Sequence, residues 1–159
     1  MRSDAPPSIR LLDADDVGLM ESLLTVFGIA FGDPDTYGAK RPTTNYLARL
    51  LGEDTFIALV ALVDGKVVGG LAAYELRKFE QQRTEIYIYD LAVAEPHRRK
   101  GLATALIREL QRIGARRGAY VIFVQADHGD EPAIQLYSRL GTREDVLHFD
   151  IPTDAGKHA

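Results

Sequence analysis

A basic turn followed by a glycine is the segment whose residue types point most directly to chemistry. In YDLAVAEPHRRKGLATALI a strand-like run gives way to a turn, and Gly101 stands where a helix begins. Backbone amides at a helix N-terminus attract anions, and a glycine there lets a phosphate approach the main chain closely. These features predict a phosphate-binding turn, although a solvated basic turn before an ordinary helix has the same composition. The cationic or small side chains of the turn are His97, Arg98, Arg99, Lys100 and Ala103.

Asp90 is a second candidate, because it interrupts the otherwise apolar strand-like run TEIYIYDLAV. A carboxylate in such a run is costly unless it is paired or functional, so Asp90 could be a general base or could orient an amine. A structural aspartate bonded to backbone amides explains the residue equally well. Strict alternation places Asp90 on the face of Ile86 and Ile88, whereas a β-bulge would reverse this assignment.

Several further acidic side chains could hold a cationic substrate through charge-assisted hydrogen bonds. Each one taken singly is more simply a solvated surface acid. Asp127, His128 and Asp130 could also form a metal cluster, but mixed Asp and His loops are usually polar turns, and we expect no metal. The candidate substrate carboxylates are Glu75, Glu80, Glu85, Asp127, Asp130 and Asp150.

The hydrophobic periodicity predicts the elements that position these groups. The order of helices and strands predicts a mixed sheet with helices packed on it, an α/β or α+β sandwich. The run AYVIFVQA is continuously apolar, as expected for a strand that is covered on both faces. The segment GDPDTYGAKRPTT is predicted to be a loop, and Asp64-Gly65 to be the turn of a hairpin. Helices are predicted from Asp13 or Asp16 to about Phe27, and over 44–51, 101–118 and 131–141; strands over 55–63, 66–76, 84–93, 119–126 and 145–151.

Composition limits the possible classes of protein. The 159 residues predict a single domain over 1–159, with loose ends at about 1–7 and 152–159. No cysteine is present, which excludes disulfides, thiolate metal sites and cysteine nucleophiles. A net charge of −4 argues against nucleic-acid binding and suits a cationic small substrate. We expect a cytoplasmic protein, since neither a signal peptide nor a membrane span is indicated.

The strand LAV followed by Arg98-x-x-Gly101-x-Ala103 resembles the acyl-CoA signature of the GNAT acetyltransferase superfamily. The resemblance implies a GNAT-like mixed, mostly antiparallel sheet flanked by about four helices, with acetyl-CoA as co-substrate. It implies that Tyr137, in the second motif AIQLYSRLG, is the acid near the CoA sulfur; by its helix alone Tyr137 would be a core residue. It assigns the pantetheine arm to backbone groups of Leu91, Ala92 and Val93, and the pyrophosphate to Arg98, Arg99, Lys100, Gly101, Ala103 and Thr104.

Seven ordered blocks resemble the aminoglycoside 3-N-acetyltransferase branch of that superfamily. They are TFIALVAL, GGLAAYEL, KFEQ, EIYIYDLAV, HRRKGLATALI, GAYVIFVQAD and AIQLYSRLG. The resemblance implies direct acetyl transfer to the 3-amino group of gentamicin-like antibiotics, antibiotic resistance and a homodimer. Asp90 is then the expected base and Tyr137 the acid, and the alternative base is Glu85 or a water held by either carboxylate. The alternatives are a GNAT enzyme that acetylates a polyamine or a protein amine, and a non-catalytic acyl-CoA-binding module.

Overall fold

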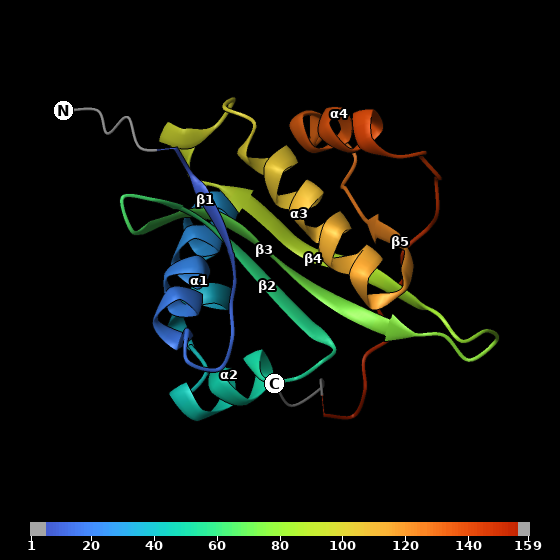
Figure 1. Ribbon diagram of the computed structural model, residues 1–159, viewed down its shortest axis with the longest axis horizontal. Coiled ribbons are helices and arrows are strands. Elements are labelled where there is room, and N and C mark those ends of the chain that lie inside the picture. Colours follow the sequence, from blue (N-terminus) through green and yellow to red (C-terminus); the bar gives the residue numbers. More distant parts are fainter. Residues whose placement is uncertain (1–5, 156–159) are drawn as a thin grey trace. The chain divides into compact units, whose positions relative to one another are not determined.

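The computed structural model describes residues 6–155 (Figure 1). These residues fall into two compact units, of which the first ends at Gln125 and the second begins at Ala126. The predicted loose ends therefore lie partly outside the described residues, and the single-domain assignment stays a prediction. The second unit contains helix α4 (Glu131–Leu140). The first unit contains, in chain order, β1 (Ser8–Leu11), α1 (Val17–Phe31), the short π-helix η1 (Asp35–Ala39), α2 (Thr44–Leu51), β2 (Phe56–Val63), β3 (Lys66–Arg77), β4 (Thr84–Val93), the 3-10 turn η2 (Glu95–His97), α3 (Leu102–Arg117) and β5 (Ala119–Val124).

The strands of the first unit form a five-stranded sheet in the order β1-β2-β3-β4-β5. The pairs from β1 to β4 are antiparallel, and β5 joins β4 in parallel after the α3 crossover. The predicted mixed, mostly antiparallel sheet is confirmed. Strand β1 was not predicted from the sequence, because a four-residue strand carries too little alternation to be recognised.

Local signals account for the hairpin and for most of the helices. Asp64 and Gly65 both adopt positive φ, at 52° and 75°, as a two-residue type I′ turn requires. Helix α2 begins after Thr43, whose side chain accepts from the amide of Tyr46, and it ends where the sequence predicted. The expected loop before α2 contains η1, a single π-helical turn that period-based reasoning does not detect.

Helices cover the central strands on both faces, so that all but the last two residues of β2 are buried. Leu23 of α1 packs closely over Gly70, where an added Cβ would lie 2.4 Å from the carbonyl oxygen of Leu59 and 2.6 Å from a Leu23 methyl group. On the other face α3 lies close to β4, and a Cβ on Gly114 would lie 3.1 Å from the Ile86 side chain. The sheet is thus the middle layer, with α1 and α2 on one face and α3 on the other.

Two strand predictions are wrong. Strand β5 is not covered on both faces, since Tyr120, Val121 and Phe123 are exposed and β5 lies at the edge of the described sheet. Residues 145–151 alternate like a strand but form none in the described structure. Alternation records which side chains could share a face, whereas a strand also needs a neighbour that supplies backbone hydrogen bonds.

Helix α4 of the second unit begins as predicted. The Asp130 side chain accepts a hydrogen bond from the amide of Ala133, and Pro132 occupies the first turn. The helix ends at Leu140, before Gly141.

Candidate functional site

A β-bulge in β4 decides where Asp90 points. Ala73 pairs with Ile88 and Ala72 pairs with Asp90, so Tyr89 is an extra residue between the two pairs. The bulge moves Asp90 away from the Ile86 side of the sheet and onto the side that carries Ala72, which packs with α1 and α2. Strict alternation therefore predicted the wrong face for Asp90. The alternative prediction, a β-bulge that reverses the face, is confirmed.

Asp90 is half-buried and receives a hydrogen bond from Tyr37 of η1, whose hydroxyl lies 2.9 Å from Oδ2. Desolvation raises the pKa of the Asp90 carboxyl above its ordinary value, and the Tyr37 hydrogen bond offsets part of this rise. Burial and the neighbouring Asp90 also raise the pKa of Tyr37, so its phenol stays protonated at neutral pH and serves as the donor. The pair can therefore hold a carboxylate that is more basic than a surface acid and fixed in direction.

Tyr37 was not identified from the sequence, and packing against α1 holds it in place. Its ring contacts Phe27 and Phe31, with centroid separations of 5.9 and 5.6 Å. Gly28 permits this approach, because a Cβ at that position would lie 3.2 Å from the Tyr37 Cβ. Arg41 fixes the backbone by donating to the Tyr37 carbonyl at 3.1 Å. An aromatic residue in an otherwise polar loop is the only signal that the sequence offered.

The turn after β4 presents free amides to an anion. Arg98 Nε donates to the Val93 carbonyl at 2.8 Å and so ties the turn to the end of the strand. Arg99 and Gly101 adopt positive φ, at 62° and 79°, and α3 then begins without a side-chain cap. The first amides of α3 belong to Leu102, Ala103 and Thr104. Because no side chain caps them, they remain available to an anion, and Lys100 and Arg99 are exposed in the same turn.

Gly101 leaves space where a ligand could approach. A Cβ built on this residue would have no atom within 4 Å, so the protein does not fill that position. The donor set of helix amides, arginine and lysine matches the phosphates of CoA. These residues fit the co-substrate that the sequence implied.

The C-terminal half of β4 has one open edge. On the β3 side the ladder continues to Val93, which pairs with Gly69, whereas on the β5 side it ends at Ile88. Strand β5 ends at Val124, the partner of Ile88, so in the described structure the backbone groups of Leu91, Ala92 and Val93 on this side lack a ladder partner. An extended amide-containing chain could pair with them, as expected for the pantetheine arm.

Tyr137 lies in α4 of the second unit and is half-buried. Burial and, to a smaller extent, the charge of Asp130 raise the pKa of Tyr137 to about 12. The phenol is therefore protonated at neutral pH and can donate a proton. Its role as the acid stays a prediction.

Comparison with known proteins agrees with this geometry. The model of the acetyltransferase (GNAT) family matches residues 20–142. The chain belongs to the GNAT family of acetyltransferases. The five-stranded mixed sheet with its flanking helices is the GNAT fold.

Solved structures of two acetyltransferases share this fold over nearly the whole chain. An aminoglycoside acetyltransferase from an uncultured soil metagenomic sample is 61% identical, with a TM-score of 0.92, over 94% of this chain and all of that one. A second such enzyme from a soil metagenomic sample, in complex with sisomicin, is 29% identical with a TM-score of 0.87, over 93% and 97% of the two chains. Streptothricin acetyltransferase of Streptomyces lavendulae is 35% identical over 94 residues, which are 57% of this chain and 47% of that protein. The match thus spans less than half the length of this curated relative.

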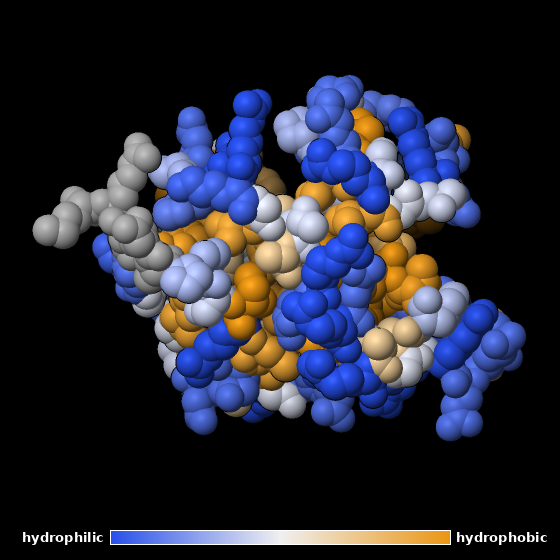
Figure 2. Space-filling view, turned by 45° about the horizontal axis from the view of Figure 1, so that its top comes forward, coloured by the Kyte–Doolittle hydropathy of each residue, from blue (hydrophilic) through white to orange (hydrophobic). Residues whose placement is uncertain are grey.

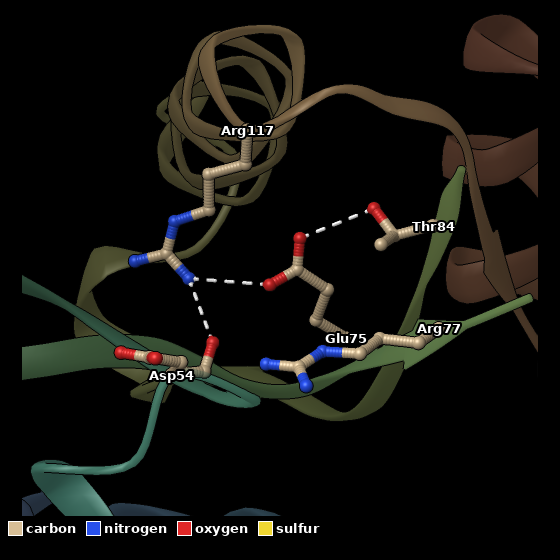
Figure 3. A pocket seen from close by; sticks show the side chains of 5 residues that line it. All are labelled: Asp54, Glu75, Arg77, Thr84 and Arg117. Carbon is tan, nitrogen blue, oxygen red and sulfur yellow. Dashed lines mark hydrogen bonds and ion pairs between the residues drawn. The ribbon is translucent and has the colours of Figure 1, made fainter. Parts of the chain in front are cut away.

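Two predicted substrate carboxylates of this GNAT chain lie near the start of β4, roughly 10 to 17 Å along the strands from Asp90. Glu85 belongs to β4, and Glu75 belongs to β3 and pairs with Ile86. Glu75 lines a pocket of about 440 Å³, and its carboxylate lies 3.6 Å from Arg117 and 3.1 Å from Thr84 Oγ1 (Figure 3). Arg117 also donates to the Asp54 carbonyl at 3.2 Å. These contacts join the end of α3 to the sheet.

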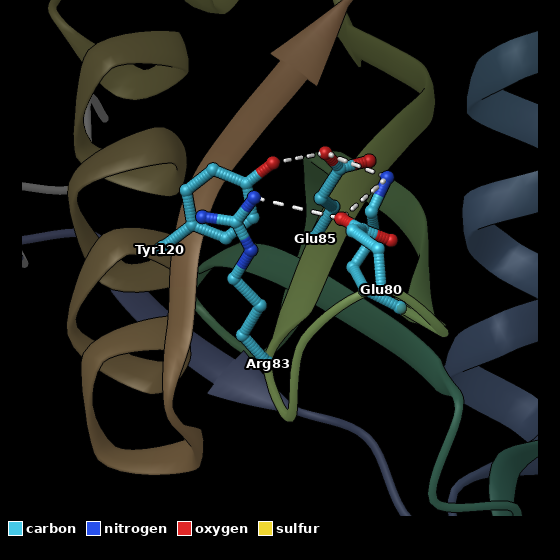
Figure 4. Close-up of polar contacts among 5 residues, drawn as sticks. Glu80, Arg83, Glu85 and Tyr120 are labelled. Carbon is cyan, nitrogen blue, oxygen red and sulfur yellow. Dashed lines mark hydrogen bonds and ion pairs between the residues drawn. The ribbon is translucent and has the colours of Figure 1, made fainter.

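Glu85 belongs to a separate ion network (Figure 4). It accepts a hydrogen bond from Tyr120 and lies 3.4 Å from Lys78. Arg83 lies 3.5 Å from Glu80 and 3.9 Å above the Tyr120 ring. The Tyr120 hydrogen bond first, and Lys78 next, lower the pKa of Glu85. This network braces the β3–β4 connection against β5, and a contact between Glu85 and the substrate stays a prediction.

The remaining predicted acids belong to the second unit. Asp130 caps α4, Asp127 accepts from the Asp130 amide through its carbonyl at 3.2 Å, and Asp150 is exposed beside His148 at 2.9 Å. Their contacts with substrate stay predictions. Among residues 6–155, no group of three or more histidine and acidic side chains is arranged to hold a metal ion. Over the same residues, no helix is both long enough and apolar enough to cross a membrane.

Proposed function

We propose that this GNAT chain is an acetyl-CoA-dependent N-acetyltransferase that acetylates the 3-amino group of aminoglycoside antibiotics and thereby confers resistance. The observation that carries the aminoglycoside as acceptor is the 61% identity to an aminoglycoside acetyltransferase, which covers all of that chain. The 3-amino position rests on the resemblance of the seven sequence blocks. The uncapped α3 turn and the Asp90–Tyr37 pair support it, because they supply a phosphate site and a basic carboxylate in one unit.

Acetyl-CoA supplies an activated acyl group as a thioester. The amides of Leu102, Ala103 and Thr104, with Arg99 and Lys100, would hold its phosphates at the start of α3. Arg98 would act differently, since its guanidinium already binds the Val93 carbonyl and orders the turn. The open edge of β4 would align the thioester arm along Leu91 to Val93.

Asp90 would receive the proton of the attacking amine. The Tyr37 hydroxyl donates to Oδ2 of Asp90. In the described residues no side chain donates to Oδ1 of Asp90, so this oxygen can accept a hydrogen bond from an ammonium group. The raised pKa of Asp90 makes proton removal easier than a surface carboxylate would. The amine then forms the new C–N bond as the thioester C–S bond breaks. The ammonium group first loses one proton to Asp90. The nitrogen loses its second proton to water as the amide forms, and the sulfur takes one proton from Tyr137.

A thiol-release assay with acetyl-CoA tests the proposal. The panel contains gentamicin, an aminoglycoside without a free 3-amino group, spermidine and a peptide with a free N-terminus. We expect turnover with gentamicin alone, with the acetyl group on the 3-nitrogen by NMR. Turnover with spermidine or the peptide in its place would favour one of the alternative acceptors. Acetyl-CoA binding without turnover of any amine would identify a binding module.

We also propose a homodimer, as the family resemblance implies. Light scattering coupled to size exclusion tests it, and a mass of 17.6 kDa, that of one chain, would refute it.

A further inference from the structure

Aromatic side chains form a continuous strip across neighbouring strands beside Asp90. Tyr74 of β3 contacts Tyr89 of β4 with ring centroids 6.0 Å apart, and Tyr89 contacts Tyr87 at 5.9 Å. Tyr87 in turn stacks on Phe123 of β5 at 4.8 Å, with the ring planes 8° apart. We call these four residues, Tyr74, Tyr87, Tyr89 and Phe123, the aromatic strip.

Register places the strip on the same side of the sheet as Asp90. Tyr74 pairs with Tyr87. Ala72 lies on the same face as Tyr74, two residues earlier in β3, and pairs with Asp90. The bulge residue Tyr89 lies between the two pairs. Asp90 is close enough that its charge contributes, after burial, to the raised pKa of both Tyr74 and Tyr87.

The strip is open to a ligand. Tyr89 is 62% exposed, and Tyr74 and Phe123 are 38% and 37% exposed. Contiguous exposed aromatic surface is unusual on a protein face that binds nothing. In the part of the chain that the structure describes, the recorded cation–π contact is Arg83 over Tyr120, which is not in the strip. Figure 2 shows one face of the molecule, where hydrophobic residues lie between hydrophilic ones.

Charge near the strip selects among possible ligands. The carboxylates of Asp90 and Glu53 both act on Tyr74. Aromatic faces attract cations, and carboxylates beside them disfavour an anion and make a purely apolar ligand a poor match. Flat rings also suit the apolar face of a sugar ring, while the phenol groups can exchange hydrogen bonds with hydroxyls. An amino sugar combines these features.

We propose that the aromatic strip binds the amino-sugar rings of the acceptor, and that Tyr89 and Tyr74 determine acceptor specificity. This inference rests on the proposed function, since it names how that site would recognise its substrate. Tyr89 contributes most, because it is the most exposed ring and adjoins Asp90 in the chain.

Two substitutions at Tyr89 and one control test the strip. Tyr89→Leu removes the ring but keeps an apolar side chain, and Tyr89→Phe keeps the ring. Phe79→Leu is the control, because Phe79 is fully exposed on the β3–β4 connection and does not belong to the strip. Thermal melts establish that each variant folds, as expected for exposed positions. Tyr74→Leu is a second variant at the other exposed tyrosine of the strip.

The readouts are steady-state kinetics with gentamicin and calorimetric titration of gentamicin into the CoA-bound enzyme. We expect Tyr89→Leu to raise KM and Kd for gentamicin about 3- to 30-fold, the range of one cation–π contact. The kcat and the KM for acetyl-CoA should not change, and Phe79→Leu should match the wild type. Tyr89→Phe keeps the ring and loses only the hydroxyl, so it should weaken gentamicin binding less than Tyr89→Leu does. Loss of kcat without a change in gentamicin affinity would overturn the inference, as would wild-type affinity in both leucine variants of the strip.

Failure of the proposed function has a different signature. In that case the wild-type enzyme itself would release no thiol with gentamicin and would give no heat of binding. Such a result would remove both the proposed acceptor and the strip as its binding site.

Discussion

Gly101 provides a test of the phosphate turn, because the chain contains its own control. Gly101 and Gly118 flank the two ends of α3, with φ of 79° and 80°, and neither would bring an added Cβ within 4 Å of another group. Alanine at either position therefore meets the same local strain, about 1 to 2 kcal/mol for a left-handed conformation. We expect both variants to lose about 2 to 8 °C in Tm.

The two variants should differ only in CoA binding. At Gly101 the new methyl group enters the space through which a phosphate would reach the α3 amides. Losing one hydrogen bond to a charged group costs about 1.5 to 3 kcal/mol, which corresponds to a roughly 10- to 150-fold weaker Kd. Gly118→Ala, at the far end of the helix, should bind CoA as the wild type does.

Calorimetric titration of CoA, with melts of the same samples, measures both effects. Equal CoA affinity in the two folded variants would refute the assignment of the turn. If Gly101→Ala does not fold, Gly101→Asn replaces it, since asparagine tolerates the left-handed region better and still carries a Cβ.

The remaining predictions concern the acceptor side. Tyr137→Phe should lower kcat by roughly two to four powers of ten with little change in CoA affinity, and a near wild-type single-turnover rate would remove the phenol from the mechanism. Asp90→Asn should lower kcat/KM and remove the acidic limb of its pH profile. Because the pKa of Asp90 is raised in the folded state, the protonation of Asp90 stabilises the fold below pH 3.8, and this stabilisation is lost as pH rises through the folded pKa. Urea titrations at pH 7 should therefore find Asp90→Asn no less stable than the wild type. Tyr37→Phe removes the hydrogen bond that lowers the pKa of Asp90, so the acidic limb should move to higher pH, and an unmoved limb would contradict the pairing. Gentamicin KM should rise with added salt if carboxylates hold a polycation, and an insensitive KM would argue against them.

Features that depend on residues close in the chain could be predicted from the sequence. The phosphate turn needs only a strand end, cationic residues and Gly101 within one short segment, and local chain geometry then sets the direction of the amides. The Asp64-Gly65 hairpin and the Asp130 cap are local in the same sense. The family also follows from such ordered local blocks.

Only the tertiary structure decided how Asp90 is used. Its face depends on a bulge that forms against β3, and its partner Tyr37 lies 53 residues away on a turn that sequence periodicity cannot detect. Residues 145–151 make the same point in reverse, since alternation predicted a strand for which no backbone partner is present in the described structure. A sequence records which side chains could share a face, but pairing between distant segments determines which groups meet, because hydrogen bonds and burial are satisfied between strands and helices rather than within one segment.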